Sequence, residues 1–295
     1  MKKNNNLENL YILLFFIISI VFTIFFVGLN NIWFSNTNWL YGAGDLTNAQ
    51  LGWQYFHHDK WHFPIGKNPN YGLEISNSIV FTDNIPLFAI FFKIFGSLLY
   101  EKFQYFSLWI FLCLFLQLYF AYLILKKATK NKFISFLTSF LFLLSPFMFY
   151  RLTYHFSLGG HWLLLYTFYI AYFIKEKDKS HHWYILIALS LLIHLYFTLM
   201  IFVIYSCFLL EEIVRKKNYT LSLRLFYKIT FAIIIMFVIG YFESSPINSV
   251  SSGYGEYKLD LLSFFDPKVS TTLTWSTFLK DLRGTHLEGF NYIGL

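Results

Sequence analysis

Residues 10–29, LYILLFFIISIVFTIFFVGL, form an uncharged apolar run that decides the fold class of this chain. About 20 such residues in a helix match a hydrocarbon core about 30 Å thick. The run follows Lys2 and Lys3 but lacks a small-residue cleavage site, and it exceeds the apolar core of a signal peptide. It therefore predicts a retained first membrane helix. Composition agrees, because 13% of the 295 residues are charged, against about 25% in soluble domains.

Six further apolar runs follow, at residues 85–100, 105–125, 133–150, 162–174, 183–210 and 225–241. Basic residues gather between these runs, at 2–3, 126–132, 175–179 and 215–217. Because basic loops stay in the cytoplasm, these clusters set the topology of the chain. The formal net charge of +7 therefore does not indicate a nucleic-acid partner.

For two of these runs the number of membrane crossings is ambiguous, and the positions of the basic clusters decide it. If residues 85–100 crossed the membrane, the cluster at 126–132 would lie outside. We expect this run to lie along the outer interface instead, with Lys93 lifted to headgroup level. As a single helix, residues 183–210 would be about 42 Å long, which is too long for a simple span. A hairpin that turns near His194 is therefore favoured. These assignments predict seven spanning helices with the N-terminus inside.

The predicted fold class is all-α, a polytopic integral membrane protein. Residues 1–242 form the transmembrane module, and its first outer loop covers residues 30–103. Residues 243–295 are expected to form an extracytoplasmic loop that continues into a missing C-terminal part. Cys113 and Cys207 lie inside apolar runs, which argues against a disulfide framework or a zinc site.

Asp45 is the first candidate for chemistry. It directly follows Gly42-Ala43-Gly44, just beyond the first helix, and this glycine-flanked carboxylate leaves room for a substrate to approach. The spacing of the next apolar residues predicts one face of a short helix on the membrane, formed by Leu46, Ala49, Trp53 and Phe56. The alternative is that Asp45 only caps this helix, a role worth about 1 kcal/mol.

Asp83 precedes a second helix start at Pro86, so capping alone is again an alternative. Together Asp45 and Asp83 could act as a base and its orienting partner, or they could hold a divalent metal. A third ligand of suitable spacing is missing, so a metal cofactor stays an open alternative. Conventional metal-ligand spacing is also missing among His57, His58, Asp59 and His62.

Arg151, His155 and His161 lie in a second segment that the topology places on the outer side. If the helix that begins near Phe133 continues outward, Arg151 and His155 are four residues apart and share one face. A guanidinium and an imidazole at headgroup depth make a good phosphate site. The alternatives are contacts with lipid phosphates and, for His161, an interface anchor. His194 is expected to be a turn residue or an anchor.

A series of short motifs runs through the chain: Gly44-Asp45, Gln50-Leu51-Gly52-Trp53, Phe63-Pro64, Gly66, Asn68-Pro69-Asn70-Tyr71-Gly72 and SIVFTDNIP at 78–86. Later members are Arg151, His155, His161-Trp162-Leu163-Leu164, His194-Leu195-Tyr196 and Gly253-Tyr254-Gly255-Glu256-Tyr257. With these motifs nearly the whole chain resembles an uncharacterised family of bacterial polytopic membrane proteins, grouped with the GT-C glycosyltransferase superfamily. The stretch from Asn68 to Pro86 is the most specific part.

The resemblance implies a GT-C fold, a helical membrane module with interfacial helices in its first outer loop. In that superfamily an acidic residue just after the first helix typically acts as the base, and Asp45 matches this position. The donors are typically sugars linked to polyprenyl phosphate. Members usually continue into more helices and often a soluble domain, which are missing here, so the chain is expected to be a fragment that is inactive alone.

The expected function is transfer of a sugar from a polyprenyl-phosphate donor to a glycan, lipid or protein acceptor. Transfer would take place at the outer face of a bacterial inner membrane, among membrane lipids, with inversion and with Asp45 as general base. A lipid or glycan transporter (flippase) is the alternative, and it predicts ionisable groups deep inside the helices. A non-catalytic membrane scaffold would leave the acidic residues with capping roles only.

Overall fold

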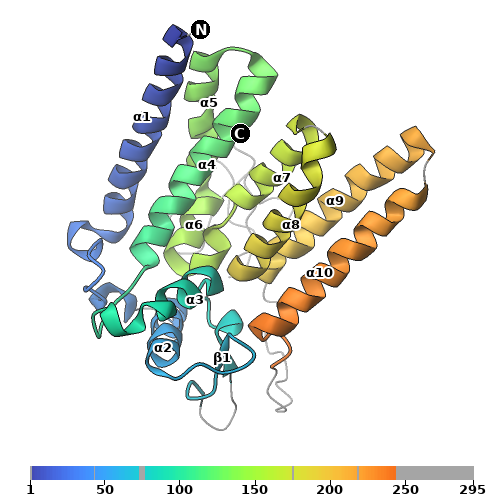
Figure 1. Cartoon of the computed structure of the whole chain (residues 1–295). Coiled ribbons are helices and arrows are strands. Elements are labelled where there is room, and N and C mark those ends of the chain that lie inside the picture. Colours follow the sequence, from blue (N-terminus) through green and yellow to red (C-terminus); the bar gives the residue numbers. More distant parts are fainter. Residues whose placement is uncertain (1, 43, 73–76, 175, 218, 244–295) are drawn as a thin grey trace, which may run out of the picture.

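A computed structural model describes residues 2–42, 44–72, 77–174, 176–217 and 219–243, and these form a helical protein (Figure 1). The predicted all-α class is confirmed. The α-helices are α1 (Lys2–Val27), α2 (Gly44–His58), α3 (Pro86–Ile94), α4 (Phe106–Thr129), α5 (Lys132–Leu143), α6 (Pro146–Tyr154), α7 (Trp162–Phe173), α8 (Glu176–Ile193), α9 (Leu195–Lys216) and α10 (Leu223–Ile239). A short antiparallel pair, β1 (Lys67–Asn68) and β2 (Asn77–Ser78), constrains the long loop between α1 and α4.

The long helices pack side by side, and α4 lies at the centre of one half (Figure 1). Helices α1, α5 and α7 all contact α4. Helices α7, α8 and α9 contact one another, and α10 packs on α8. The short helices α2 and α3 pack together at one end of these long helices (Figure 1).

Three of the described helices are long and apolar enough to cross a membrane: Asn6–Val27 within α1, all of α4 and all of α9. The predicted span at residues 133–150 is not one straight helix, because it bends by 50° between α5 and α6. Counting this bent pair gives a fourth candidate. Several apolar helices indicate a multi-pass membrane protein.

The expectation of seven spanning helices is not supported by length. Helix α7 has 12 residues, the apolar part of α8 covers Ser180–Ile193, and α10 has 17 residues. A straight span needs about 20 residues. Apolar composition alone therefore overstated the count, because it does not show where the helices break.

The run 85–100 does not form a helix long enough to cross a membrane, and the run 183–210 contains the expected break. Helix α3 has 9 residues and is about 14 Å long, which is too short to cross. The run 183–210 breaks at His194, whose backbone is extended (φ −163°, ψ 134°), and its Nδ1 accepts a hydrogen bond from Tyr196 N at 3.1 Å. Helices α8 and α9 pack against each other beyond this break, as a hairpin requires.

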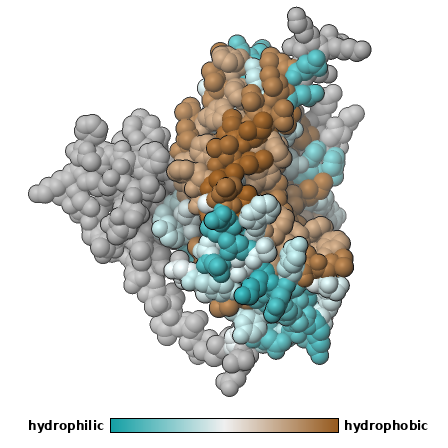
Figure 2. Space-filling model, turned by 90° about the vertical axis from the view of Figure 1, so that its left-hand side faces the viewer, coloured by the Kyte–Doolittle hydropathy of each residue, from teal (hydrophilic) through white to brown (hydrophobic). Residues whose placement is uncertain are grey.

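Different contacts hold the two ends of the helical module together. At one end, Lys132 contacts Glu8 at 3.1 Å and joins the α4–α5 connection to α1. At the other end, the first outer loop docks on the end of α10, where Gly66 N donates to Ile239 O at 3.0 Å. An apolar surface lies between these ends, above the hydrophilic loop region (Figure 2). The expected tail at 243–295 lies outside the described residues, apart from Glu243.

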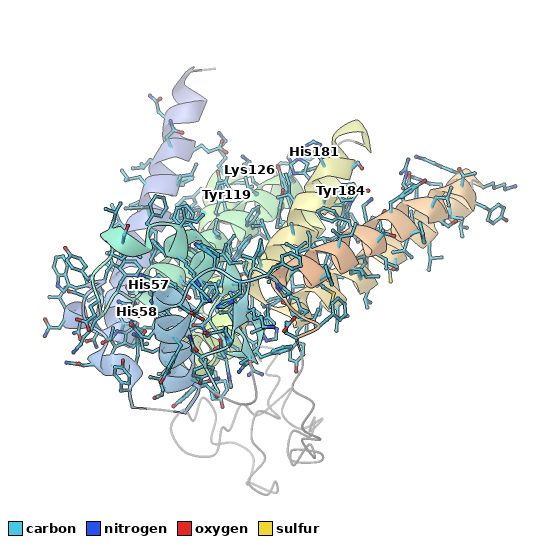
Figure 3. The ribbon with its side chains drawn as sticks, turned by 60° about the horizontal axis from the view of Figure 1, so that its bottom comes forward. His57, His58, Tyr119, Lys126, His181 and Tyr184 are labelled. Atoms are coloured by element: carbon cyan, nitrogen blue, oxygen red, sulfur yellow. The ribbon has the colours of Figure 1, made fainter. Side chains whose placement is uncertain are left out.

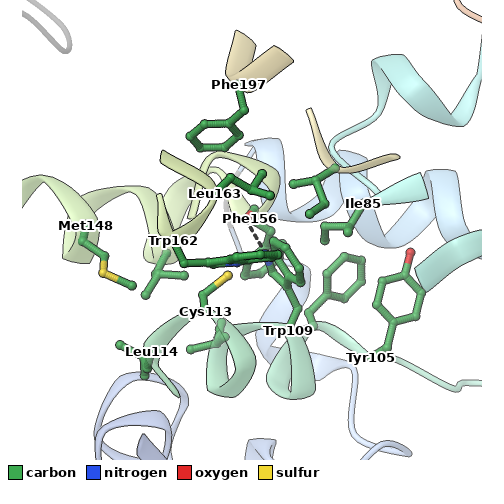
Figure 4. Close-up of a cluster of buried hydrophobic side chains, with 14 of the residues drawn as sticks. Ile85, Tyr105, Trp109, Cys113, Leu114, Met148, Phe156, Trp162, Leu163 and Phe197 are labelled. Carbon is green, nitrogen blue, oxygen red and sulfur yellow. Dashed lines mark hydrogen bonds between the residues drawn. The ribbon is translucent and has the colours of Figure 1, made fainter. Parts of the chain in front are cut away.

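An aromatic cluster supports the segment that follows α6 (Figure 4). Phe156 is fully buried and stacks on Phe106 with ring centroids 4.8 Å apart. Trp109 on α4 donates its indole N–H to Phe156 O at 2.6 Å. This buried anchor fixes the backbone between His155 and Ser157, the part of the chain that enters the candidate site.

Candidate functional site

Asp45 lies in the first turn of α2 and contacts a residue from a distant segment. Its Oδ2 is 3.4 Å from His155 Nδ1, just beyond the end of α6. The Asp45 side chain is 57% exposed and that of His155 is 24% exposed. A carboxylate in the first helical turn is also stabilised by the helix dipole. The structure thus joins two predicted site residues and keeps the carboxylate accessible.

The predicted apolar face of α2 holds Asp45 in place. Ala49, Trp53 and Phe56 are fully buried. The Trp53 indole N–H donates to Phe103 O at 2.7 Å, which ties α2 to the segment before α4. Because α2 is anchored along its length, its N-terminal turn has a defined position relative to α6.

Gly52 lets a second loop approach the same helix closely. A Cβ at Gly52 would lie 2.4 Å from Asn84 Nδ2 and 2.8 Å from Thr82. Further hydrogen bonds fix this contact, since Asn68 Nδ2 donates to Gly52 O at 2.9 Å and Tyr105 OH donates to Asn84 O. The loop that carries Asp83 therefore lies directly against α2.

The capping role considered for Asp83 is not observed. The residue before α3 is Ile85, and α3 has no side-chain cap. Asp83 Oδ1 instead accepts hydrogen bonds from Ser157 N at 3.0 Å and from Ser157 Oγ. These bonds connect the loop between α1 and α4 to the segment after α6, beside His155.

Burial raises the pKa of Asp83 to about 6, although the Ser157 hydrogen bonds and the nearby His155 act in the opposite direction. Asp83 Oδ2 is buried and has no hydrogen-bond partner among the described residues. The charge of Asp45 also raises this pKa, so the two carboxylates influence each other. The carboxyl group of Asp83 is thus held partly desolvated, beside an accessible carboxylate.

The backbone around Asp83 adopts unusual conformations. Asp83 has φ 56° and Ile85 has φ 47°. Positive φ is rare for a β-branched residue such as Ile85, which is fully buried here. Such conformations cost about 1–3 kcal/mol each and cluster at active sites and ligand clamps. Packing against α2 and α4 maintains this loop in its strained form.

Arg151, His161 and His194 are electrostatic neighbours of the same region. Burial lowers the pKa of His161 to about 4, and the charge of Arg151 adds to this effect. Burial also lowers the pKa of His194 to about 4, with further contributions from His155 and Arg151. Both imidazoles are therefore neutral near pH 7. Neither can supply a positive charge to a bound phosphate at this pH.

His194 is a turn residue, as expected, and its hydrogen bond also determines which ring nitrogen carries the proton. Its Nδ1 accepts a backbone hydrogen bond, so the neutral ring carries its proton on Nε2. Ser157, the partner of Asp83, was not identified from the sequence. The available signal was its position inside the outward segment 151–161, between two residues that had been identified.

The other end of α2 holds its ionisable residues in local contacts. His58 Nδ1 is 2.8 Å from Gln54 O, and His62 Nε2 is 3.0 Å from Asp59 Oδ2. His57 and His58 lie on α2, away from Lys126 and His181 (Figure 3). Among the described residues, no group of three or more His, Cys, Asp or Glu side chains could hold a metal ion.

We had expected Lys93 to extend its ammonium group to headgroup level, but the side chain is buried within the protein. Its side chain is 5% exposed, and Nζ lies 3.9 Å from the ring centroid of Phe56 and 4.9 Å from that of Trp61. Nζ also donates to Lys60 O at 3.2 Å. These favourable contacts with aromatic faces and a carbonyl hold Lys93 between α3 and α2.

Comparisons with known proteins give one match. No curated protein and no solved structure matches this chain. A family model described as a domain of unknown function, DUF6311, matches residues 16–295, which include every candidate residue above. The match covers most of the chain, so the protein belongs to the DUF6311 family.

Proposed function

We propose that this protein is a membrane glycosyltransferase of GT-C type, which transfers a sugar from a polyprenyl-phosphate donor at the outer face of a bacterial inner membrane. The observation that carries the proposal is the contact between Asp45 and His155. It places an accessible carboxylate and an imidazole at the end of a multi-pass helical module. The Asp45 and 68–86 motifs resemble an uncharacterised family of membrane proteins that is grouped with the GT-C superfamily, and this resemblance supports the same reaction.

Asp45 is the general base in this proposal. It accepts the proton of the acceptor hydroxyl while the hydroxyl oxygen attacks the anomeric carbon of the sugar. The bond from this carbon to the phosphate oxygen breaks on the opposite side, so the configuration inverts. A general base must be within reach of the proton that it accepts, and the 57% exposure of the Asp45 side chain supports this role.

Arg151 balances the charge of the leaving lipid phosphate. A guanidinium matches the geometry of a phosphate group and stabilises negative charge that develops in the transition state. His155 lies 3.4 Å from Asp45 and orients its carboxylate. In this proposal the same imidazole also faces the donor. His161 is neutral, so its proposed role is reduced to hydrogen bonding. A divalent metal at the phosphate stays an alternative.

Asp83 positions the other groups and supports the base. Its carboxyl is held by Ser157 in the same segment as His155, and its loop packs on the helix that carries Asp45. The strained backbone at Asp83 and Ile85 favours a functional role for this loop over capping.

The test is to purify the full-length protein and incubate it with a panel of polyprenyl-phosphate sugars, together with a bacterial membrane extract that supplies glycan, lipid and protein acceptors. Donor consumption and the glycosylated product are followed by mass spectrometry. The proposal expects consumption of at least one donor together with formation of polyprenyl phosphate. Absence of turnover for every donor would contradict it, and movement of an intact donor across a vesicle membrane would favour the flippase alternative.

A further inference from the structure

A cavity lies far from Asp45, between α7, α8, α9 and α10. Its volume is about 410 Å³, which lies within the range of small-molecule sites. Its lining includes the cations Arg215, Arg224 and Lys228 together with aromatic rings such as Trp183 and Tyr205. None of the residues discussed for sugar transfer lies in this cavity.

Lys228 is the most unusual residue of the lining. Its side chain is only 2% exposed. Nζ lies 4.9 Å from the ring centroid of Tyr184 and 5.0 Å from that of Tyr205, and no carboxylate of the described residues forms an ion pair with it. Burial of an ammonium group is costly unless an anion compensates its charge. The aromatic faces provide part of this compensation, and the cavity has room for an anion.

The carboxylates of the lining do not compensate this charge. Glu212 contacts Lys216 at 2.8 Å and Arg224 at 3.5 Å, so it is engaged by two other cations. Glu211 also lines the cavity. The described residues of the lining carry three formal positive charges, on Arg215, Arg224 and Lys228, and two negative charges, on Glu211 and Glu212.

The position of the cavity indicates where its ligand comes from. Lys228 lies five residues beyond the start of α10, about 8 Å along the helix axis. This end of α10 is opposite the end that docks on the first outer loop, and Tyr184 lies away from α2 (Figure 3). Basic pockets between membrane helices on the cytoplasmic side bind anionic lipid headgroups.

We propose that this cavity binds the phosphate-bearing headgroup of an anionic membrane lipid, with Lys228 at its base and Arg215 and Arg224 at its walls. The arginines match the phosphate oxygens with their planar donors. Trp183 and Tyr205 contact the less polar part of the lipid. The site does not depend on the transferase reaction, so it can be tested separately.

The test is native mass spectrometry of the full chain in a neutral detergent, titrated with phosphatidylglycerol or phosphatidylcholine. The unmodified protein should retain phosphatidylglycerol in preference. K228M should weaken this binding about tenfold or more, because it removes a buried charge partner. K228R keeps the charge and should retain the preference. K93M is the matched control, since Lys93 is also buried against two rings but does not line this cavity.

Inorganic phosphate and sn-glycerol-3-phosphate are added as competitors to distinguish a lipid from a soluble phosphate ligand. Displacement of the lipid only at concentrations far above that of the lipid supports the lipid assignment, and binding of soluble phosphate with equal affinity overturns it. Equal retention of both lipids by the unmodified protein, or an unchanged preference in K228M, also overturns the proposal. If K228M does not fold, R224M is measured in its place, because Arg224 also lines the cavity; a weakened preference in R224M supports the site and an unchanged preference overturns it.

Discussion

Each end of α2 has a contact between an aspartate and a histidine, but the two contacts differ in how far apart the partners lie in the sequence. At its N-terminal end, Asp45 contacts His155 from another segment at 3.4 Å. At its C-terminal end, Asp59 contacts His62 at 3.0 Å, three residues away in the same loop. Both contacts join a carboxylate to an imidazole. Only the first one depends on the tertiary fold.

This difference separates a candidate site from local structure. Local pairs form wherever neighbouring residues happen to match, so they require no particular tertiary arrangement. A contact between distant segments requires several elements to be held in place, as Gly52, Ser157 and the Phe156 anchor do here. The strained loop at Asp83 lies at this end as well. We therefore assign the chemistry to the N-terminal end of α2.

Replacement of Asp45 should have the largest effect. D45N keeps the shape of the side chain but removes the base, so sugar transfer should fall by about 10²- to 10⁴-fold. D59N makes the same change at the other end of α2 and should leave the rate nearly unchanged. Both rates are measured as donor consumption in the full-length protein. Equal losses in the two variants would remove the distinction between the two ends.

Gly52→Ala should break the contact between α2 and the Asp83 loop. The new Cβ would lie 2.4 Å from Asn84 Nδ2, and overpacking of this kind costs about 1–3 kcal/mol. Gly44→Ala is the control, because nothing lies within 4 Å of its Cβ position. Thermal unfolding in detergent measures both. A fully stable G52A protein would show that this close approach is not required.

Asp83→Asn should change how stability depends on pH. The pKa of Asp83 is raised from 3.8 to about 6 in the folded state, so the folded protein binds more protons between these values and loses stability as the pH rises. The loss is complete above about pH 7 and is on the order of 1–3 kcal/mol. D83N cannot ionise, and asparagine tolerates positive φ.

The stability of D83N relative to the unmodified protein should therefore increase from pH 4 to pH 7. Denaturation midpoints at several pH values measure it. A difference between D83N and the unmodified protein that is constant across this range would contradict the assignment.

Removal of the local pair at the other end of α2 should have the smallest effect. His62→Asn breaks a contact between partly exposed groups, with side chains 21% and 11% exposed. We expect a change of at most about 1 kcal/mol in stability and no change in transfer. A large loss of transfer in H62N would extend the site to the C-terminal end of α2.

Much of the fold follows from hydrophobic pattern and charge. The apolar runs at residues 10–29 and 105–125 correspond to α1 and α4, and the break at His194 was placed by helix length and charge asymmetry. The number of spans was overestimated, because Pro146 and the short α7 interrupt helices without changing their apolar composition.

The segments that form the candidate site could be predicted from the sequence, but the contacts between these segments could not. Asp45, Asp83 and His155 could be selected because their residue types are unexpected between membrane helices. Their proximity could not be derived, because it depends on the close approach at Gly52 and on the Ser157 hydrogen bonds. Lys93 was misplaced for a related reason, since its aromatic partners lie in a different segment of the loop.

The most direct measurement is a double-mutant cycle on sugar transfer by the full-length protein, with D45N, H155F and the double variant. If Asp45 and His155 act as one unit, the double variant should be no slower than the slower single variant. The coupling between the two substitutions then has the size of the smaller single effect. Defects that multiply in the double variant would show that the two residues act independently, and they would contradict a single site at the N-terminal end of α2.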